Sequence, residues 1–333
     1  MRSLATFCLL LATPLFAQAP APVDEAALLR RVEAHLDSLV AADAFSGVVL
    51  LAKNGQPVWE RSYGFADRES RRPNTVETAF NLGSINKVFT RIAIQQLAAA
   101  GKLHLDSSLA AAWPDYPNAD VARRITIRQM LGHRSGIQGD IFAAPPGKTR
   151  HDVRHNNDYL QLFVAQPLAF EPGTRQQYSN AGYVVLGMLV ERLSGKDYYD
   201  YVRAHIYAPA GMDRTGAFSV DSLPANTALG YTGWAGARQR NTATLPGRGS
   251  AAGGGYSTAH DLMRFFQALR ERRIASGPPP GGIGAAGGAF GINAAMEGAL
   301  PGGYDLIVLA NLDPPAANRV SGAIRGWIGA RDD

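Results

Sequence analysis

SGVVLLAKNGQPVWERSYG, residues 46–64, contains two strand patterns separated by a tight turn. The apolar run at residues 48–53 predicts the first strand, and residues 56–63 predict the second. Asn54-Gly55 between them is a strong hairpin signal, because both central positions of such a turn need a positive φ. The segment therefore predicts an antiparallel hairpin.

The two ends of the chain repeat this pattern of strands beside a helix. Residues 23–42 carry apolar side chains at helical spacing and predict an amphipathic helix. Near the C-terminus, residues 292–297 and 304–311 predict two strands around a Pro-Gly-Gly turn, and residues 316–330 predict a helix. We therefore expect an α+β fold in which one antiparallel sheet is flanked by the N- and C-terminal helices.

The middle of the chain is mainly helical in pattern. The candidate helices are residues 84–100, 126–132, 154–166, 180–194, 197–208 and 259–270. They predict an all-α lobe inserted into the sheet-bearing part of the chain. We expect residues 20–79 and about 250–333 to form the α/β lobe, and about 80–250 to form the mostly helical lobe.

The first residues have the pattern of a secretory signal peptide. A basic start is followed by an apolar run at 4–15, which is too short to span a bilayer, and by the small-residue site Ala-Gln-Ala at 17–19. We therefore predict a signal peptide at 1–19, a single mature domain at 20–333, and export to the periplasm or the medium. Cys8 is the only cysteine, so the mature chain has no thiol for a disulfide, a nucleophile or a metal site.

The charge pattern limits the possible partners. The net charge of +5 comes from scattered basic residues, with no basic stripe interleaved with aromatic residues, so we expect no nucleic-acid partner. After the signal, no apolar run is long enough for a membrane span. His151, Asp152 and His155 could in principle ligate a metal, since positions i and i+4 share a helical face. No HExxH pattern and no further ligand nearby supports such a site, so we expect neither a metal nor a cofactor. The expected partner is a small-molecule or peptide substrate, and the oligomeric state is not predicted.

FNLGSINKVFT, residues 80–90, places a lysine in an apolar stretch of a chain that otherwise favours arginine. If a helix begins at Ser84, Lys87 lies one turn further on the same face. Backbone N–H groups at a helix start stabilise negative charge, and a buried lysine can lose its proton near neutral pH and activate a hydroxyl. Taken alone, this two-residue pattern is more often a helix-capping serine beside a solvated lysine.

A second polar pair stands at the start of the predicted helix 180–194. Tyr178 and Asn180 can point a phenol and an amide into a cleft, where the phenol relays a proton and the amide holds Lys87 or a substrate carbonyl. Taken alone, Tyr178 is more often a packed aromatic residue and Asn180 a helix cap.

Four segments together carry a resemblance to a known superfamily. They are AFNLGSINKVFT (79–90), ITIRQMLGHRSGI (125–137), FEPGTRQQYSNAGYVVLGMLVERLSG (170–195) and GGGYSTAHDLMRFFQAL (253–269). In sequence and order they resemble the serine β-lactamase and penicillin-binding-protein-like superfamily, in its branch of class C β-lactamases, D-Ala-D-Ala carboxypeptidases and esterases. The resemblance covers most of the predicted mature chain.

The resemblance implies a role for each of these residues. Ser84 is implied as the acylated nucleophile and Lys87 as the general base. Tyr178 is implied as the proton relay, with Asn180 beside it at the substrate. The turn around His133 is implied to be structural and not a catalytic histidine site.

The third motif of the family departs from its usual form. Relatives carry Lys or His, any residue, then Gly on a strand that lines the cleft, and the matching positions here are Ala285-Ala286-Gly287. The N–H of Gly288 can still pair with that of Ser84 to bind an oxyanion. A side-chain donor for a substrate carboxylate is lost. The short segment before this motif also predicts a more open cleft.

These patterns predict an exported serine hydrolase that cleaves an ester or amide through an acyl-enzyme, as an esterase or as a D-amino-acid peptidase or β-lactamase-like enzyme. The altered third motif keeps an alternative open. In that alternative the chain is a catalytically impaired envelope binding protein of the same fold, which recognises peptidoglycan-like or penicillin-like ligands.

Overall fold

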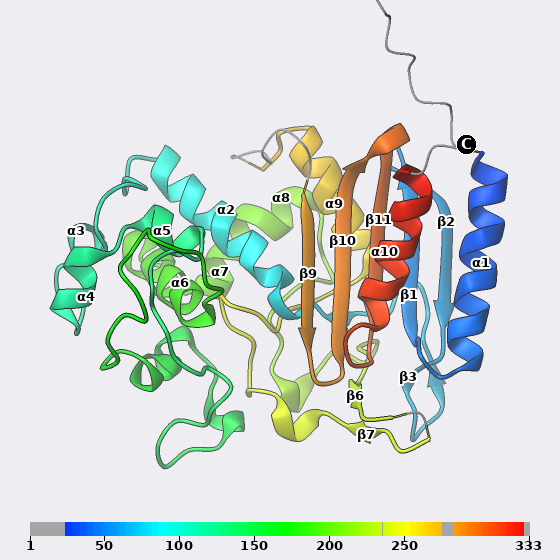
Figure 1. Cartoon of the computed structure of the whole chain (residues 1–333), viewed down its shortest axis with the longest axis horizontal. Coiled ribbons are helices and arrows are strands. Elements are labelled where there is room, and N and C mark those ends of the chain that lie inside the picture. The colour runs from blue at the N-terminus through cyan, green and yellow to red at the C-terminus, as the bar shows by residue number, and fades with distance from the viewer. Residues whose placement is uncertain (1–23, 235, 275–282, 330–333) are drawn as a thin grey trace, which may run out of the picture.

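A five-stranded antiparallel sheet brings the two ends of the chain together (Figure 1). The computed structural model describes residues 24–234, 236–274 and 283–329, so the predicted signal peptide at 1–19 lies outside the described residues. The sheet order is β2-β1-β11-β10-β9. Its strands are β1 (Gly47–Lys53), β2 (Gln56–Tyr63), β9 (Gly284–Ala289), β10 (Ile292–Leu300) and β11 (Tyr304–Ala310). Strand β1 pairs with β11 in the register Val49↔Val308, which confirms the single sheet predicted from the two chain ends.

The predicted hairpin is present and connects β1 to β2. Asn54 and Gly55 have φ values of 52° and 80°, so both central residues of the turn occupy the left-handed region that this turn type requires. The C-terminal strands β10 and β11 pair in the same antiparallel manner across Pro301–Gly303. Local turn chemistry therefore sets both hairpins.

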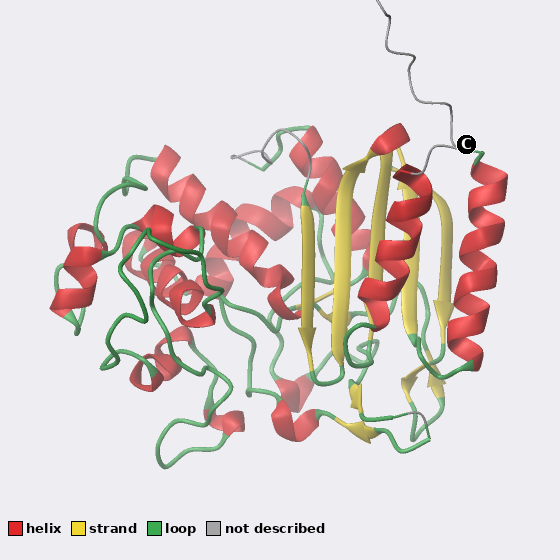
Figure 2. Ribbon diagram, in the orientation of Figure 1, coloured by secondary structure: helices red, strands yellow, loops and turns green. Residues whose placement is uncertain are grey.

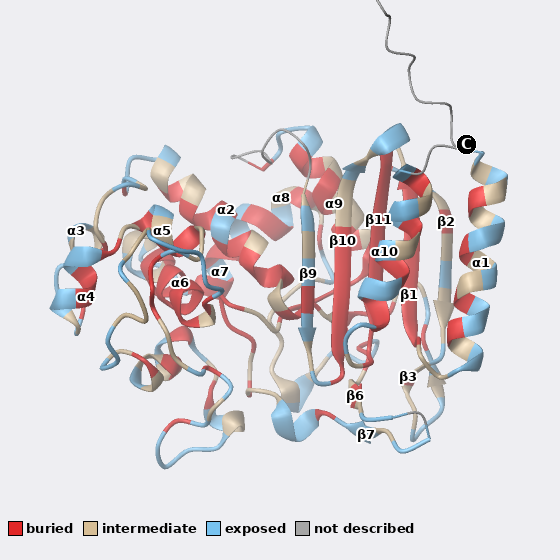
Figure 3. Ribbon diagram, viewed as in Figure 1, coloured by how far each residue is buried: buried red, intermediate tan, exposed pale blue. Residues whose placement is uncertain are grey.

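Alternating side chains of β1 serve two separate cores. Val49 and Leu51 pack with the terminal helices α1 (Glu25–Ala41) and α10 (Ala316–Gly329). Val48 and Leu50 face the opposite core, towards the helices of the middle of the chain. Because both faces of the sheet are covered, β1 and β11 are buried throughout most of their length (Figure 3). Edge strand β9 is more exposed, and it faces the helical part of the molecule (Figures 1 and 3).

The middle of the chain supplies most of the remaining helices (Figure 2). They are α2 (Asn86–Ala99), α3 (Leu109–Ala112), α4 (Ala119–Arg124), α5 (Ile127–Leu131), α6 (Asn180–Ser194), α7 (Tyr198–Val202), α8 (Ala208–Ala210) and α9 (Ala259–Arg270). The ring of Phe89 on α2 packs edge-on against Phe265 on α9, with 5.2 Å between ring centroids. This contact ties α2 to α9, which packs against β1 and β11 of the sheet, and the turn at Gly83–Ile85 that precedes α2 lies against β9.

Two predicted helices are wrong in part. Residues 154–166 form only a 3₁₀ helix, Asn156–Leu162, and the predicted helix 197–208 is interrupted by a π-helical turn between α7 and α8. Asn156 is fully buried, donates to the Glu191 side chain and accepts from the Ala251 N–H. These tertiary hydrogen bonds outweigh the local helical preference.

The segment between α8 and α9 falls mostly within the part of the chain that we expected to be mostly helical, but the structure shows little helix there. It consists of loops, two 3₁₀ turns and the short strands β6 (Tyr231–Thr232), β7 (Gln239–Arg240) and β8 (Tyr256–Ser257). Three further short strands lie earlier in the chain: β3 (Phe65–Asp67), β4 (Arg72–Pro73) and β5 (Phe80–Asn81). Strand β5 pairs with β8, and this pairing brings the loop before α9 to the start of α2.

Candidate active site

Ser84 lies at the junction between the sheet and the helical part of the chain. It belongs to a 3₁₀ turn, Gly83–Ile85, that leads directly into α2, so the helix begins slightly later than predicted and Ser84 does not cap it by a side-chain hydrogen bond. The Nζ atom of Lys87 lies 3.2 Å from the Ser84 Oγ atom. The spacing predicted from the sequence therefore brings the amine and the hydroxyl into hydrogen-bond contact.

Lys87 is buried, with only 6 % of its surface exposed. Its Nζ atom donates to the Asn180 Oδ1 atom at 2.8 Å and to the backbone carbonyl of Ala252. Burial lowers the pKa of Lys87 to about 7, because desolvation disfavours the ammonium form. A substantial fraction of Lys87 is then neutral at neutral pH and can accept the proton of the Ser84 hydroxyl.

Tyr178 approaches Ser84 from the other side. Its hydroxyl donates to the Ser84 Oγ atom at 2.7 Å, and the Lys87 Nζ atom lies 4.8 Å from the centroid of its ring. Burial raises the pKa of Tyr178, so the phenol keeps its proton. Tyr178 directly precedes Ser179, which caps α6 by accepting from the Gly182 N–H, so the start of this helix fixes the position of Tyr178.

His133 supports the ring of Tyr178 and not the nucleophile. The two rings are stacked with 4.5 Å between their centroids, and the His133 Nδ1 atom accepts from the Ser179 backbone N–H at 3.2 Å. Burial, followed by the charges of Lys87 and Arg91, lowers the pKa of His133 to about 4. The histidine is therefore neutral at neutral pH, and its φ of 57° marks the turn that the sequence predicted.

Edge strand β9 lies directly against the backbone of Ser84. A Cβ atom on Gly287 would stand 2.0 Å from the Leu82 carbonyl oxygen and 2.7 Å from the Ser84 nitrogen, so only glycine allows this approach. The Gly288 nitrogen lies 3.0 Å from the position of a Cβ atom on Gly83. The structure thus brings together the backbone groups predicted to bind an oxyanion, and that role stays a prediction.

The altered third motif leaves no charged side chain on β9. Ala285 and Ala286 occupy the two positions before Gly287, and the strand reads Gly-Ala-Ala-Gly-Gly-Ala over its whole length. A substrate carboxylate at this strand would find only backbone groups.

Sequence reasoning assigned no role to the loop before α9, which supplies the third contact of Lys87. The Gly255 carbonyl accepts from the Leu82 N–H at 2.7 Å, and the Gly254 N–H donates to the Gly83 carbonyl at 3.2 Å. These bonds hold the Ala252 carbonyl beside Lys87. The glycine run at residues 253–255 is the feature of the sequence that could have indicated this close backbone contact, because glycine has no side chain to prevent it.

Comparison with known proteins identifies the family. The family model described as Beta-lactamase matches residues 32–323 of the 333 residues. The chain belongs to the beta-lactamase family.

Relatives of this beta-lactamase family protein include penicillin-binding proteins and an esterase. Penicillin-binding protein 4* of Bacillus subtilis is 31 % identical over 195 residues, which are 57 % of this chain and 42 % of that protein. Esterase EstB of Burkholderia gladioli is 29 % identical over 283 residues, covering 74 % of this chain and 71 % of the esterase. The chain thus spans less than half the length of the Bacillus subtilis relative.

A solved penicillin-binding protein from Bacillus halodurans has the same fold. It superimposes with a TM-score of 0.77 at 31 % identity, covering 88 % of this chain and 98 % of the other. This likeness confirms the predicted α+β fold and the predicted superfamily. Together with the esterase relative, membership of the family supports a serine hydrolase.

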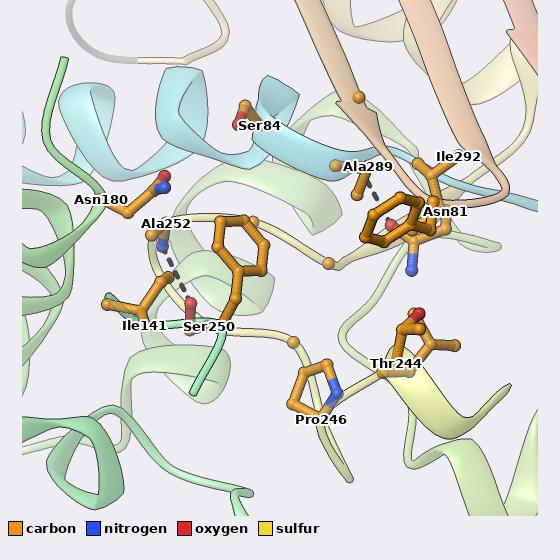
Figure 4. A pocket seen from close by; sticks show the side chains of 18 of the residues that line it. Asn81, Ser84, Ile141, Asn180, Thr244, Pro246, Ser250, Ala252, Ala289 and Ile292 are labelled. Carbon is orange, nitrogen blue, oxygen red and sulfur yellow. Dashed lines mark hydrogen bonds between the residues drawn. The ribbon is translucent and has the colours of Figure 1, made fainter. Parts of the chain in front are cut away.

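A chamber of about 810 Å³ opens beside Ser84 in this family member (Figure 4). Figure 4 shows Ile141 and Asn180 on one side and Ala289 and Ile292 on the other. The walls also include Phe142 and Phe290, two aromatic residues that the sequence analysis did not single out. A pocket of this size accommodates a small organic ligand.

The described residues contain neither a candidate metal cluster nor a candidate membrane-spanning helix. Across 24–234, 236–274 and 283–329, no group of three or more His, Cys, Asp or Glu side chains is arranged to hold a metal ion. In the same ranges, no helix has the length and apolar character needed to cross a membrane.

Proposed function

We propose that this chain is an exported serine hydrolase that cleaves an ester or amide of a small molecule or peptide through an acyl-enzyme on Ser84. The observation that carries the proposal is the contact between the Ser84 hydroxyl and the buried amine of Lys87, whose pKa is lowered to about 7. Relatives named as penicillin-binding proteins and as an esterase support the same chemistry. The signal pattern at residues 1–19 supports export.

The first step forms the acyl-enzyme. Neutral Lys87 takes the proton of the Ser84 hydroxyl while the Oγ atom attacks the substrate carbonyl carbon. Negative charge develops on the carbonyl oxygen, where the N–H groups of Ser84 and Gly288 are proposed to stabilise it. The Lys87 proton then passes through the Tyr178 hydroxyl to the leaving group, which departs as a neutral alcohol or amine.

The second step releases the acyl group. A water molecule attacks the carbonyl carbon of the ester on Ser84 and gives a proton to Lys87. The bond between that carbon and the Ser84 Oγ atom then breaks, the Oγ atom takes up the proton, and the acyl group leaves as a carboxylic acid. Asn180 holds Lys87 in position throughout, because its Oδ1 atom accepts from the Nζ atom at 2.8 Å. Each step uses only side chains and backbone groups of this chain and water.

One observation favours a second candidate, a catalytically impaired envelope binding protein. Strand β9 carries no charged side chain, and Ala285 occupies the position at which the resemblance implies Lys or His, so β9 offers no charged contact to a peptidoglycan-like or penicillin-like substrate. The two candidates differ in one property that can be measured, which is the reactivity of Ser84.

The deciding experiment is intact-protein mass spectrometry after incubation with a fluorophosphonate, with the adduct mapped by peptide digestion. We expect one adduct on Ser84, no adduct in Ser84→Ala, and strongly slowed labelling in Lys87→Ala. Ser70→Ala, at an exposed serine, is the matched control and should label as the wild type does. A folded wild-type protein that stays unlabelled would favour the binding protein.

A further inference from the structure

We propose that the chamber beside Ser84 holds the acyl part of the substrate and selects an acyl group that is apolar and uncharged. This inference rests on the proposed hydrolase function and adds the substrate class. It follows from three features of the chamber: which groups of the site line it, what its walls are made of, and how its charged side chains are engaged.

The chamber lies on the acyl side of the reacting bond. Asn180 and Gly288 line it together with Ser84, whereas Tyr178 is not among its lining residues and is half exposed. Tyr178 passes the proton to the leaving group in the proposed mechanism, so the leaving group departs on the Tyr178 side. The part of the substrate that stays bonded to Ser84 therefore extends into the chamber.

The walls of the chamber are mainly apolar. Ile141, Leu245 and Ile292 contribute aliphatic surface, and Phe142 and Phe290 contribute two phenyl rings. These two residues are 56 % and 65 % exposed, and they belong to the four exposed large hydrophobic residues among the described residues. Exposed apolar surface gathered around a cavity marks a place where an apolar ligand is removed from water.

The charged side chains that line the chamber are Arg150 and Asp313, and both are engaged by nearby backbone groups. The Arg150 guanidinium donates to the carbonyls of Ile141 at 3.0 Å and Thr244 at 2.9 Å. It thereby ties two loops of the wall together.

The Asp313 carboxylate accepts from the backbone N–H groups of Gly291 at 2.6 Å and Gly233 at 2.8 Å. The bond to Gly291 holds the turn between β9 and β10. Strand β9 itself carries no charged side chain. Arg150 lines the chamber, but its Nε and Nη1 atoms already donate to two backbone carbonyls, so a bidentate pair with a substrate carboxylate would have to share or release one of these bonds.

The proposal predicts how the specificity constant depends on acyl length. Each methylene removed from water raises kcat/KM by up to about fourfold until the chamber is filled. The wild-type protein should therefore prefer 4-nitrophenyl octanoate to the hexanoate, butanoate and acetate, in that order. The mono-4-nitrophenyl ester of octanedioic acid has a similar length but ends in a carboxylate, and it should react at least about tenfold more slowly than the octanoate.

Variants of the chamber walls test the assignment. In Phe142→Ala and Phe290→Ala, the ratio of kcat/KM between octanoate and acetate should fall at least about tenfold, because part of the apolar wall is removed. Trp234→Ala is the matched control, since this residue is 87 % exposed and does not line the chamber. That variant should keep the wild-type ratio.

A binding measurement separates the chamber from catalysis. Calorimetry on Ser84→Ala with butanamide and octanamide should show at least about tenfold tighter binding of octanamide. The additional change Phe290→Ala should reduce this preference. Chain-length-dependent binding without any turnover by the wild type would support the chamber and refute the proposed hydrolase.

Three results would overturn the inference. The first is turnover with no dependence on acyl length, which leaves the proposed hydrolase intact. The second is an unchanged octanoate-to-acetate ratio in both Phe142→Ala and Phe290→Ala. The third is equal or faster turnover of the carboxylate-ended ester, lost in Arg150→Gln, which would make Arg150 an anion-binding residue.

Discussion

Replacing Lys87 by methionine tests whether the buried amine loses its proton near neutral pH in the folded protein. Methionine keeps a long unbranched side chain but removes the ionisable group and its hydrogen bonds to Ser84, Asn180 and the Ala252 carbonyl. Turnover should fall by about 10²- to 10⁴-fold, as expected when a general base is lost. Lys87→Met should also change how the free energy of unfolding depends on pH.

The magnitude follows from the two pKa values of Lys87. Its pKa is about 7 in the folded protein and 10.5 when the side chain is solvated. Because the folded value is the lower one, the unfolded chain binds more protons between these values, and wild-type stability rises with pH across that window. The folding penalty of this lysine is about 5 kcal/mol at pH 6 and about 2 kcal/mol at pH 9.

The wild type should therefore gain about 2.5–3 kcal/mol relative to Lys87→Met between pH 6 and pH 9. The lost hydrogen bonds to Asn180 and Ala252 change the absolute difference but not this slope, since neither acceptor titrates in the range. Urea unfolding followed by tryptophan fluorescence at four pH values measures it. Lys102→Met, the same change at an exposed lysine, is the control and should show no such slope.

A stability difference between wild type and Lys87→Met that changed by less than about 0.5 kcal/mol from pH 6 to pH 9 would refute the reasoning. It would mean that Lys87 stays protonated in the folded protein. The lysine could then bind an anion but could not act as the base.

The remaining predictions concern the rate and the backbone of the site. The kcat/KM for an activated ester should rise about tenfold per pH unit up to about pH 7, where Lys87 becomes neutral, and then level off. A kcat/KM that still rose above about pH 9 would contradict a Lys87 pKa of about 7. Tyr178→Phe keeps the ring but removes the hydroxyl, so kcat should fall about 10²-fold while fluorophosphonate still labels Ser84; undiminished kcat would remove Tyr178 from the proton path. Gly287→Ala places a Cβ atom 2.0 Å from the Leu82 carbonyl oxygen, so the Tm should fall and fluorophosphonate labelling of Ser84 should be lost. A wild-type Tm together with wild-type labelling would show that β9 does not pack closely against the Ser84 backbone.

Local patterns in the sequence were sufficient for the framework of the fold. The two strand patterns and the Asn54-Gly55 turn predicted the first hairpin, and α6 and α9 begin and end at the residues that their helical periodicity predicted. These features depend on neighbours in the chain, which is why they can be predicted from the order of residues alone. The 3₁₀ helix at Asn156–Leu162 shows the limit, because buried hydrogen bonds to distant residues decide it.

The same division holds for the site. The sequence by itself predicted that Ser84 and Lys87 lie on one face, because residues three apart on a helical turn are neighbours. The resemblance to the superfamily implied the roles of this pair and of Tyr178 and Asn180 at the start of α6. Only the tertiary structure decided the rest. The Ala252 carbonyl on Lys87, the stack of His133 on Tyr178, and the apolar chamber all join segments far apart in the chain. Such contacts depend on how the loops pack, and packing is a property of the folded chain that no local pattern of residues contains.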